Sequence, residues 1–412
     1  MGDSTLAHTT ALQDFDPALL VDRAMRFLIL RGPVTAQERW EENSGYSPST
    51  LAQIIAAVAC AADLASERQA AQAAEFLWDY ADWLAASLER WTVTNCRELV
   101  AGLPKHYVRI TPAQPQPGRI RPDPNTSKIQ IANGGGMHAA RNVVDAGFLQ
   151  LVRLGIRPAD DPIIVDSIAV VDSVLKHDLP QGPAWQRYNH DGYGQHADGR
   201  AFDGSGQGRC WPLLTGERGH YELAAVRDAT PYIKTLEGFA SSGGLLAEQL
   251  WDAPDLPQAS MYCGSPAGSA MPLCWAHAEY ISLVRSVRDG VCFDRIDPLY
   301  RRYVVGRQSN RVEVWTLTHQ PSRVACGRRL RIICESAASL HWSSDGWSSQ
   351  QKLDLKSNAL GLFVADLPVE SLPAGCLVEF TLHGLPNEPG LAENYVVELA
   401  QETGQAECVS RA

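Results

Sequence analysis

Hydrophobic positions along the first three-quarters of the chain recur with the period of a helix. In residues 20–28 and again in residues 76–84, apolar side chains occupy positions i, i+4, i+7 and i+8, which is the pattern of one buried helical face. Residues 49–65 are apolar on nearly every side, which is typical of a helix buried on both faces. We therefore predict a mainly helical region.

Four of these helices have a recognisable start. Each start pairs a side-chain acceptor at the N-cap with proline at the first helical position, as in Asp16-Pro17, Ser47-Pro48, Asp161-Pro162 and Thr230-Pro231. Together with the periodic stretches, these starts predict about eight helices. We expect them near residues 17–31, 48–65, 69–90, 140–154, 161–177, 213–228, 230–243 and 270–288.

The pattern changes to a two-residue period after about Arg311, with turn residues between short alternating stretches. Roughly 100 residues of this pattern are the size of a small β-sandwich. We therefore expect a mainly helical domain over residues 1–305 and a small C-terminal β-sandwich over residues 311–402. Trp342 and Trp347 in the second region would form either a sugar-stacking platform or part of its core.

Two long polar loops, residues 111–136 and 187–211, interrupt the helical region. Loops of this length in a compact domain are usually functional or without fixed structure. Their content of Gly, Asn, Asp and aromatic residues favours ordered turns around a site. We therefore expect functional residues in or beside these loops.

The composition narrows the range of partners. With 412 residues, 45% of them hydrophobic, the chain can bury a large core and divide into two domains. The net charge of -11 disfavours nucleic acid and anionic membrane surfaces as partners, whereas a neutral substrate such as a sugar is compatible with it. No apolar run reaches the roughly 18 residues of a membrane span.

The N-terminal residues 1–17 lack the basic and apolar regions of a secretory signal. If Met1 is the natural start, we expect a cytosolic protein; if an upstream portion is missing, the protein would be periplasmic or secreted. The ten cysteines are scattered singly without a CxxC pair, so the spacing typical of a zinc site is absent. We expect buried reduced thiols, no metal and no cofactor.

Three glutamates stand in aromatic-rich loops. Glu41 and Glu42 directly follow Trp40. Glu248 follows a glycine-rich turn and precedes Trp251. Two carboxylates that flank a sugar can protonate the leaving oxygen and activate a water molecule. Chance acidic residues on solvated loops are the alternative, and sequence spacing alone leaves both interpretations open.

Four longer motifs make the sequence resemble a known family. They are "ERWEENSGYSPST", "GRCWPLLTGERGHYELAAVRD", "AEQLWD" and "GSPAGSAMPLCWAHAEYISLVRS". These motifs, in this order, resemble glycoside hydrolase family 15, the glucoamylases, and are most similar to its bacterial branch. The resemblance covers nearly the whole chain, so it is far more specific than a short motif.

The resemblance implies a fold and a set of roles. The fold would be an (α/α)6-barrel, with inner and outer rings of helices and a site at one end. Glu41, the first Glu of the Trp-Glu-Glu motif, would be the general acid, Glu248 the general base, and Glu42 a hydrogen-bonding partner of the sugar. Further substrate contacts would come from Arg209 and Trp211 at the innermost subsites and from Trp40 and Trp275 in the pocket wall.

Two residues in these motifs, Trp275 and Glu217, have alternative interpretations. Trp275 could equally be a core aromatic residue of the last helix. Glu217, in the "TGERGHYEL" stretch, more plausibly supports a helix start and the pocket than acts as a catalyst.

The implied chemistry is an inverting hydrolysis. The charge of Glu42 and a partly apolar wall at Trp40 would both raise the pKa of Glu41 and keep it protonated. Glu248 would stay ionised and deprotonate water, with the two carboxyl groups roughly 6.5–9.5 Å apart. The product would be β-glucose from an α-linked chain end.

The chain departs from the family pattern in its length. The family's barrel has twelve helices, with the Trp-Glu-Glu motif after the fifth, whereas here the motif follows the first. The N-terminal β-sandwich of bacterial members and the Arg-Asp pair that grips the terminal glucose are not recognisable; Arg227-Asp228 lies on a later helix. A second chain could complete such a barrel.

Three functions are compatible with the sequence. The leading one is an exo-acting α-glucosidase that acts on starch-like glucans or dextrins. A relative on the same fold that hydrolyses dextran or trehalose is the second. The third is a catalytically incomplete remnant that only binds α-glucan.

Overall fold

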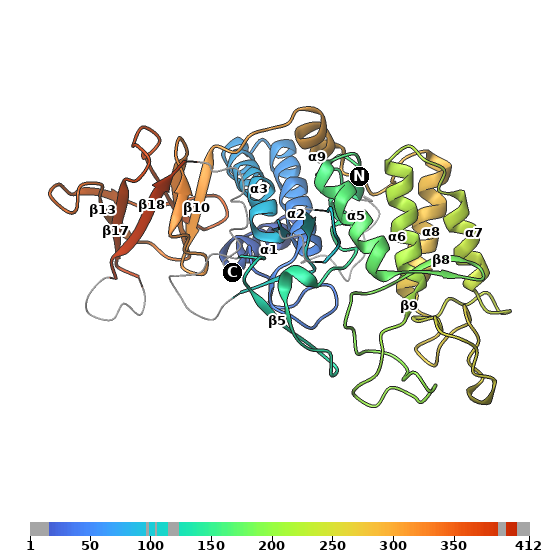
Figure 1. Ribbon diagram of the computed structural model, residues 1–412. Helices are drawn as coiled ribbons and strands as arrows, with labels where there is room; N and C mark the ends of the chain where they lie inside the picture. Colours follow the sequence, from blue (N-terminus) through green and yellow to red (C-terminus); the bar gives the residue numbers. More distant parts are fainter. Residues whose placement is uncertain (1–15, 96–98, 104, 114–122, 386–392, 402–412) are drawn as a thin grey trace. The chain divides into compact units, whose positions relative to one another are not determined.

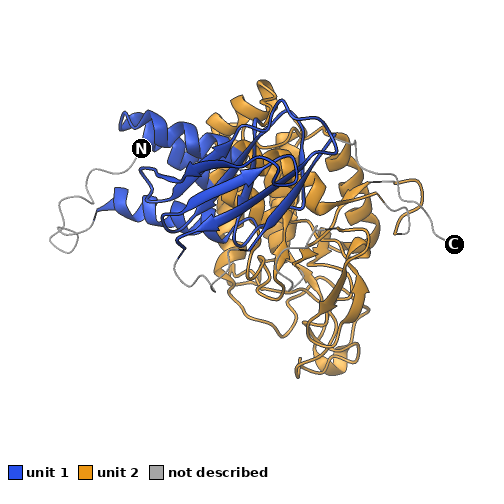
Figure 2. Ribbon diagram, turned by 90° about the vertical axis from the view of Figure 1, so that its left-hand side faces the viewer, with its two compact units in different colours: residues 1–33, 57–81, 311–401 blue, residues 34–56, 82–310, 402–412 orange. Residues whose placement is uncertain are grey.

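The computed structural model describes residues 16–95, 99–103, 105–113, 123–385 and 393–401 (Figure 1). The expectations for residues 1–15 and for Cys96 and Cys408 lie outside this part of the chain. Contacts divide the chain into two compact units, which are coloured separately in Figure 2. The first unit comprises residues 1–33, 57–81 and 311–401, and the second comprises residues 34–56, 82–310 and 402–412. The units are thus interleaved along the chain, whereas the sequence suggested one boundary between residues 305 and 311.

The described chain is mainly helical before the β region, as predicted. The longer helices are α1 (Pro17–Arg31), α2 (Pro48–Glu67), α3 (Ala71–Thr92), α5 (Pro162–Leu175), α6 (Pro212–Ala224), α7 (Thr230–Phe239) and α8 (Cys274–Asp289). Shorter helical segments are α4 (Leu149–Arg153), α9 (Asp297–Leu299), the 3-10 turns Ala140–Asn142 and Pro257–Ala259, and the π-helical turn Tyr300–Val305.

The helix expected over residues 140–154 is wrong in its first half. The backbone of residues 143–145 is extended there, because other segments use its polar groups. The carbonyl oxygen of Val143 accepts from the amide of Arg109 at 2.8 Å, and the amide of Val144 donates to the side chain of Asn189 at 2.9 Å. Tertiary hydrogen bonds therefore override the local helical preference.

The predicted helix starts are correct for two caps. Asp16 accepts from the amide of Ala18, and Asp161 accepts from the amide of Ile163, each beside a proline in the first turn. Thr230 is not a cap, because α7 begins at this residue and Asp228 accepts from its amide at 2.9 Å.

Helix α2 corrects the expectation that no apolar stretch reaches the length of a membrane span. By length and composition it could cross a bilayer, and 61% of the window concerned is buried inside the protein. Buried core helices of water-soluble proteins meet the same criterion, so this property alone does not indicate a membrane protein.

The first unit contains two sheets. The four-stranded sheet has the order β10-β12-β16-β15, and the five-stranded sheet has the order β11-β18-β17-β13-β14. Their bounds are β10 Val312–Thr316, β11 Arg323–Ala325, β12 Arg329–Cys334, β13 Ser339–Ser343, β14 Gln351–Asp354, β15 Lys356–Ser357, β16 Phe363–Leu367, β17 Leu377–His383 and β18 Tyr395–Ala400. Buried residues of both sheets, including Ile332 and Phe380, form one hydrophobic cluster. Trp342 belongs to this core, whereas Trp347 lies in a turn with φ 64°.

Arginine side chains join helical segments to these sheets within the first unit. Arg26 on α1 donates to the backbone oxygen of Glu335 at 3.0 Å. Arg331 on β12 lies 3.0 Å from the carboxylate of Asp79 on α3 and 2.7 Å from that of Asp366 on β16. The helical residues 17–31 and 71–81 therefore belong to the same packed unit as the strands.

The second unit carries the elements around the expected site. Helices α6, α7 and α8 lie side by side, as Figure 1 shows, and α6 also contacts α4. Short antiparallel pairs join β1 (Gly45–Tyr46) to β4 (Thr111–Pro112), β2 (Val93–Thr94) to β3 (His106–Tyr107) and β5 (Lys128–Ile131) to β6 (Gly136–Ala139). A three-stranded sheet contains β7 (Lys176–Leu179), β8 (Gly182–Gln186) and β9 (Cys210–Trp211), and β9 leads directly into α6.

Candidate active site

A tight loop before α2 carries the adjacent glutamates. Thr35 and Gly45 exchange backbone hydrogen bonds of 2.9 and 3.0 Å, which close the loop at its base. At its tip, the amide of Glu41 donates to the carbonyl oxygen of Glu38 at 2.8 Å, and Glu41 has φ 59°. For a residue other than glycine, this left-handed backbone conformation costs about 1–2 kcal/mol.

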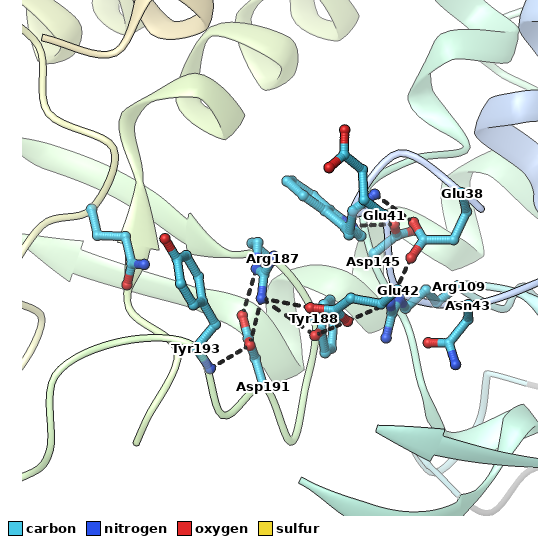
Figure 3. Close-up of polar contacts among 12 residues, drawn as sticks. Glu38, Glu41, Glu42, Asn43, Arg109, Asp145, Arg187, Tyr188, Asp191 and Tyr193 are labelled. Atoms are coloured by element: carbon cyan, nitrogen blue, oxygen red, sulfur yellow. Dashed lines mark hydrogen bonds and ion pairs between the residues drawn. The ribbon is translucent and has the colours of Figure 1, made fainter. Parts of the chain in front are cut away.

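This turn separates the two adjacent carboxylates. Figure 3 shows the Glu41 side chain turned away from the ion pairs that hold Glu42. Glu41 is exposed, and among the described residues its carboxylate has no hydrogen-bond partner. The strained tip thus leaves one carboxylate free while the other is bound to the protein.

The Glu42 carboxylate is neutralised by two arginines. Nη2 of Arg109 lies 2.8 Å from Oε2 of Glu42, and Nη2 of Arg187 lies 3.1 Å from Oε1. The hydroxyl of Tyr188 also donates to Glu42. Both premises of the sequence argument for Glu41 therefore need correction: Glu41 is exposed rather than against an apolar wall, and the neighbouring charge is compensated.

Glu38 is a second carboxylate on the same guanidinium, and the sequence analysis missed it. Glu38 is buried, and its Oε1 lies 2.6 Å from Nη2 of Arg109. Its Oε2 accepts from the amide of Trp40 at 2.8 Å. Arg109 is buried as well and stacks over the ring of Tyr188, with 3.6 Å from its guanidinium carbon to the ring centroid. Arg109 therefore holds the loop from both sides of its tip.

Trp40 is fixed through its indole nitrogen. Nε1 of Trp40 donates to Oδ2 of Asp145 at 3.1 Å, and the amide of Gly147 donates to Oδ1 at 3.0 Å. Burial raises the pKa of Asp145 to about 6, although the guanidinium of Arg39 opposes this shift. Asp145 therefore orients the indole ring from inside the protein.

Three tryptophans come together as the sequence predicted, although their roles toward a substrate stay a prediction. The ring of Trp40 lies 5.5 Å from that of Trp211 and 5.8 Å from that of Trp275. Trp211 is buried, and among the described residues its Nε1 has no hydrogen-bond partner. Trp275 is 40% exposed, so it is not a core residue of the second unit as described. The cluster offers an indole N–H and an aromatic face.

Glu248 comes from a different segment and contacts Tyr193, six residues after Arg187. Its Oε2 lies 3.3 Å from the hydroxyl of Tyr193, and its amide donates to the carbonyl oxygen of Ala270 at 2.8 Å. Burial raises the pKa of Glu248, whereas the hydroxyl of Tyr193 favours the ionised form and opposes the shift. The carboxylate is partly buried and remains accessible.

Asp191 connects the two ends of this loop. Its carboxylate accepts from Nε of Arg187 at 2.7 Å and from Nη2 at 2.8 Å. The same carboxylate accepts from the amide of Tyr193 at 2.9 Å. Residues 187–193 therefore form a fixed turn that binds Glu42 through Arg187 and Glu248 through Tyr193. Figure 3 shows the contacts of Arg187 with Glu42 and Asp191.

Two further sequence candidates have all their described contacts inside the protein. Arg209 is 1% exposed, and its guanidinium donates to Asp252 at 2.9 Å and to the carbonyl oxygens of Gln195 and His196. Its contact with a sugar stays a prediction. Glu217 is buried in a two-point pair with Arg39, at 2.6 and 3.1 Å, which agrees with its exclusion from the catalysts.

A polar cavity of about 460 Å³ adjoins this cluster within the second unit. Its lining includes Glu38, Arg39, Glu217 and the exposed face of Trp275, together with residues of α2, α4 and α8. Charged and amide side chains dominate the walls, so a ligand rich in hydroxyl groups would find partners there.

Carboxylates around an aromatic cluster, carried by loops on a helical scaffold, are the arrangement typical of carbohydrate-active enzymes. The profile of "Glycosyl hydrolases family 15" matches residues 3–285. The chain belongs to this family, as the sequence motifs predicted.

Two relatives illustrate the extent of the match. A glucoamylase from Clostridium sp. (strain G0005) is 44% identical over 286 residues, which are 69% of this chain and 38% of that protein. The crystal structure of a bacterial glucoamylase complexed with acarbose is 42% identical, covers 71% of this chain and 41% of its own, and superposes with a TM-score of 0.63. The chain thus spans about two fifths of the length of these relatives.

Replacing Arg109 tests whether it holds the site together. We expect Arg109→Leu to lower the free energy of unfolding by about 3–5 kcal/mol, because it leaves two carboxylates without their shared cation. Arg200→Leu is the matched control: Arg200 is 65% exposed in its pair with Asp198, and solvent-exposed pairs of this kind contribute little to stability. Urea unfolding of both variants gives the comparison. Equal losses in the two variants would show that Arg109 is not a structural cation.

The raised pKa of Asp145 leads us to expect that the stability of the protein depends on pH. Because its pKa is raised from 3.8 to about 6, the folded protein binds more protons than the unfolded chain between these values. The free energy of unfolding therefore falls as pH rises through this window and stays lower above it. For each pH unit in this window, the free energy of unfolding of the unmodified protein should fall by up to about 1.4 kcal/mol more than that of Asp145→Asn. Urea unfolding at pH 4 to 7 measures this, and parallel pH profiles would contradict it.

Proposed function

We propose that this chain carries the catalytic carboxylates of an inverting, exo-acting α-glucoside hydrolase. The substrates would be the non-reducing ends of starch-like glucans or dextrins, and the product β-D-glucose. In the same proposal, the helices are part of an (α/α)6-barrel, the two sheets form a β-sandwich, and a second polypeptide would complete the barrel. Membership of the family supports this proposal, and the relatives named glucoamylase suggest the substrate class.

One observation supports the proposal most strongly. A single turn, residues 187–193, binds the Glu42 carboxylate through Arg187 and the Glu248 carboxylate through Tyr193. Glu41 and Glu248 are far apart in sequence, but the loops that carry them both contact this turn. Fixed positions for two carboxyl groups are what in-line attack by water and departure of the sugar require.

The proposed roles follow from the environment of each carboxylate. Glu41 has an exposed side chain without a protein partner among the described residues, and in its protonated form it would give its proton to the glycosidic oxygen. Burial raises the pKa of Glu248, and the hydroxyl of Tyr193 opposes this shift and favours the ionised form that a base requires. Glu42 is held by Arg109, Arg187 and Tyr188, and it would present the remaining lone pair of Oε1 to a sugar hydroxyl.

The aromatic residues would supply binding rather than chemistry. The exposed face of Trp275 would cover the apolar face of a sugar ring, and the buried ring of Trp211 would support this wall through Trp40. Buried arginines beside the rings, with Arg187 5.2 Å from Trp40 and 5.5 Å from Trp211, would keep this wall rigid during binding.

Anomer-resolved hydrolysis tests the proposal. The purified chain is incubated with maltoheptaose, and glucose is followed by proton NMR before mutarotation. We expect β-glucose first, and a rate lower by about 10²–10⁴ in Glu41→Gln and in Glu248→Gln, because each loses a proton-transfer group. Glu75→Gln, at an exposed position of α3, is the matched control and should keep the full rate.

Three results would contradict or redirect the proposal. α-Glucose as the first product would exclude the inverting mechanism. Turnover of isomaltose-type or trehalose substrates in preference to maltoheptaose would favour the dextran- or trehalose-hydrolysing alternative. No hydrolysis by a folded chain that still binds acarbose in calorimetry would favour the remnant that only binds α-glucan.

The hydrogen bond from Tyr193 to Glu248 leads us to expect that replacing Tyr193 shifts the pH dependence of hydrolysis. Tyr193→Phe removes the donor that favours ionised Glu248, so burial raises the pKa of Glu248 further. The acid limb of kcat/KM should therefore move to higher pH, because a base with a higher pKa becomes ionised only at higher pH. Tyr280→Phe, which removes a 2.8 Å hydrogen bond to Glu237, is the control. A lower kcat with an unmoved acid limb would show that Tyr193 only supports the fold.

A further inference from the structure

The sheet β7-β8-β9 brings three metal-ligating side chains together. His177 lies on β7, Cys210 on β9 and Asp252 in the segment that pairs with β9. Their ligand atoms all lie within 4.8 Å of one another. The three residues are far apart in the sequence, so a search for closely spaced cysteines could not find the group. None of them has a role in the proposed hydrolysis.

The backbone around this group is fixed by hydrogen bonds. The carbonyl oxygen of Cys210 accepts from the amide of Leu250 at 2.8 Å, and the amide of Cys210 donates to Oδ2 of Asp252 at 3.1 Å. Gln186, opposite Cys210 in the sheet, donates to the same oxygen at 3.0 Å. Outer hydrogen bonds that orient a ligand carboxylate in this way are typical of protein metal sites.

Asp252 retains capacity for one more partner. Its Oδ1 lies 2.9 Å from Nη1 of Arg209, and its Oδ2 accepts from Gln186 and Cys210. A carboxylate offers about four lone-pair sites; the fourth faces the Cys210 thiol, whose proton would leave when zinc binds and takes its place. The buried guanidinium of Arg209 holds this carboxylate in place from its other side.

A second thiol lies beside the group. Cys263 is partly buried and packs against the hydrophobic cluster that contains Cys210. Its segment is joined to the residues after Leu250, because the amide of Gly264 donates to the carbonyl oxygen of Trp251 at 2.8 Å. Both Cys210 and Cys263 are free thiols, so both are available as ligands.

The donor set selects among metal ions. Ca²⁺ and Mg²⁺ prefer oxygen ligands only, whereas one imidazole, one carboxylate and two thiolates match the tetrahedral N, O and S environment of Zn²⁺. Zinc bonds of about 2.0–2.3 Å place tetrahedral ligand atoms roughly 3.3–3.8 Å apart. Side-chain rotations of His177 and Cys263 would close the remaining distance, since both residues are only partly buried.

We propose that His177, Cys210 and Asp252, with Cys263 as the fourth ligand, form a structural zinc site. The ion would join β7 and β9 to residues 250–264. Trp211 directly follows Cys210, and Glu248 lies two residues before Leu250. Zinc would therefore stabilise the segments that carry these two residues without touching a substrate, and the site does not depend on the proposed hydrolysis.

Metal analysis of the full chain tests this proposal. The protein is loaded with Zn²⁺, desalted and analysed by mass spectrometry of the metal, and Co²⁺ is used as a spectroscopic probe. We expect about one zinc per chain, thiolate-to-cobalt charge-transfer absorption, and a higher Tm with zinc. Cys210→Ser and His177→Gln should each weaken zinc binding at least about tenfold and abolish the increase in Tm. Cys60→Ser, at an exposed cysteine of α2, is the matched control and should behave like the unmodified protein.

Several outcomes would overturn the proposal. Zinc retained equally by all variants would show adventitious binding only. No retained zinc and no charge-transfer band in the unmodified protein would exclude the site, as would a disulfide between Cys210 and Cys263 found by mass spectrometry of the unreduced protein. His177→Gln keeps the test valid if Cys210→Ser does not fold, because His177 lies partly exposed on a hairpin. A folded His177→Gln variant with unchanged zinc affinity would contradict the proposal by itself.

Discussion

The site depends on the ion pairs that the buried guanidinium of Arg109 makes with two carboxylates. Glu38 and Glu42 both approach it, and neither carboxylate is fully exposed to water. Unpaired, two such charges would repel each other and carry a large desolvation cost. Arg187 binds Glu42 from the opposite side and is itself paired with Asp191. Charges of alternating sign thus run from one loop to the next, and removing any one leaves its neighbours unbalanced.

This charge network explains why two glutamates stand next to each other. The positive φ of Glu41 turns the backbone sharply at the tip of the loop, so the two adjacent side chains point in different directions. Its cost of about 1–2 kcal/mol is offset by the charge-assisted hydrogen bonds of Glu38 and Glu42 on either side. A strained backbone at the tip therefore persists because the surrounding ion pairs determine its conformation.

The sequence predicts the helical elements and the motif residues better than it predicts their partners. Local periodicity and proline caps reveal helices such as α1 and α5, and a family resemblance reveals Glu41 and Glu248. Arg109 and Asp145 carry no local signal, because their partners lie in distant segments and only the fold brings them together. The long loop 187–211 gave a partial signal, since its composition indicated ordered turns but not which residues would bind the carboxylates.

The turn of residues 187–193 shows how a fold sets the geometry of distant residues. Asp191 binds the side chain of Arg187 and the amide of Tyr193 at the same time, so the turn cannot lengthen without breaking one of these contacts. Glu42 is bound at one end and Glu248 at the other. The separation of the two loops is therefore fixed by a few short hydrogen bonds rather than by packing of the helices alone. Under the proposed inverting mechanism the distance between two carboxyl groups sets the stereochemical outcome, so this turn would matter to the reaction as much as the carboxylates themselves.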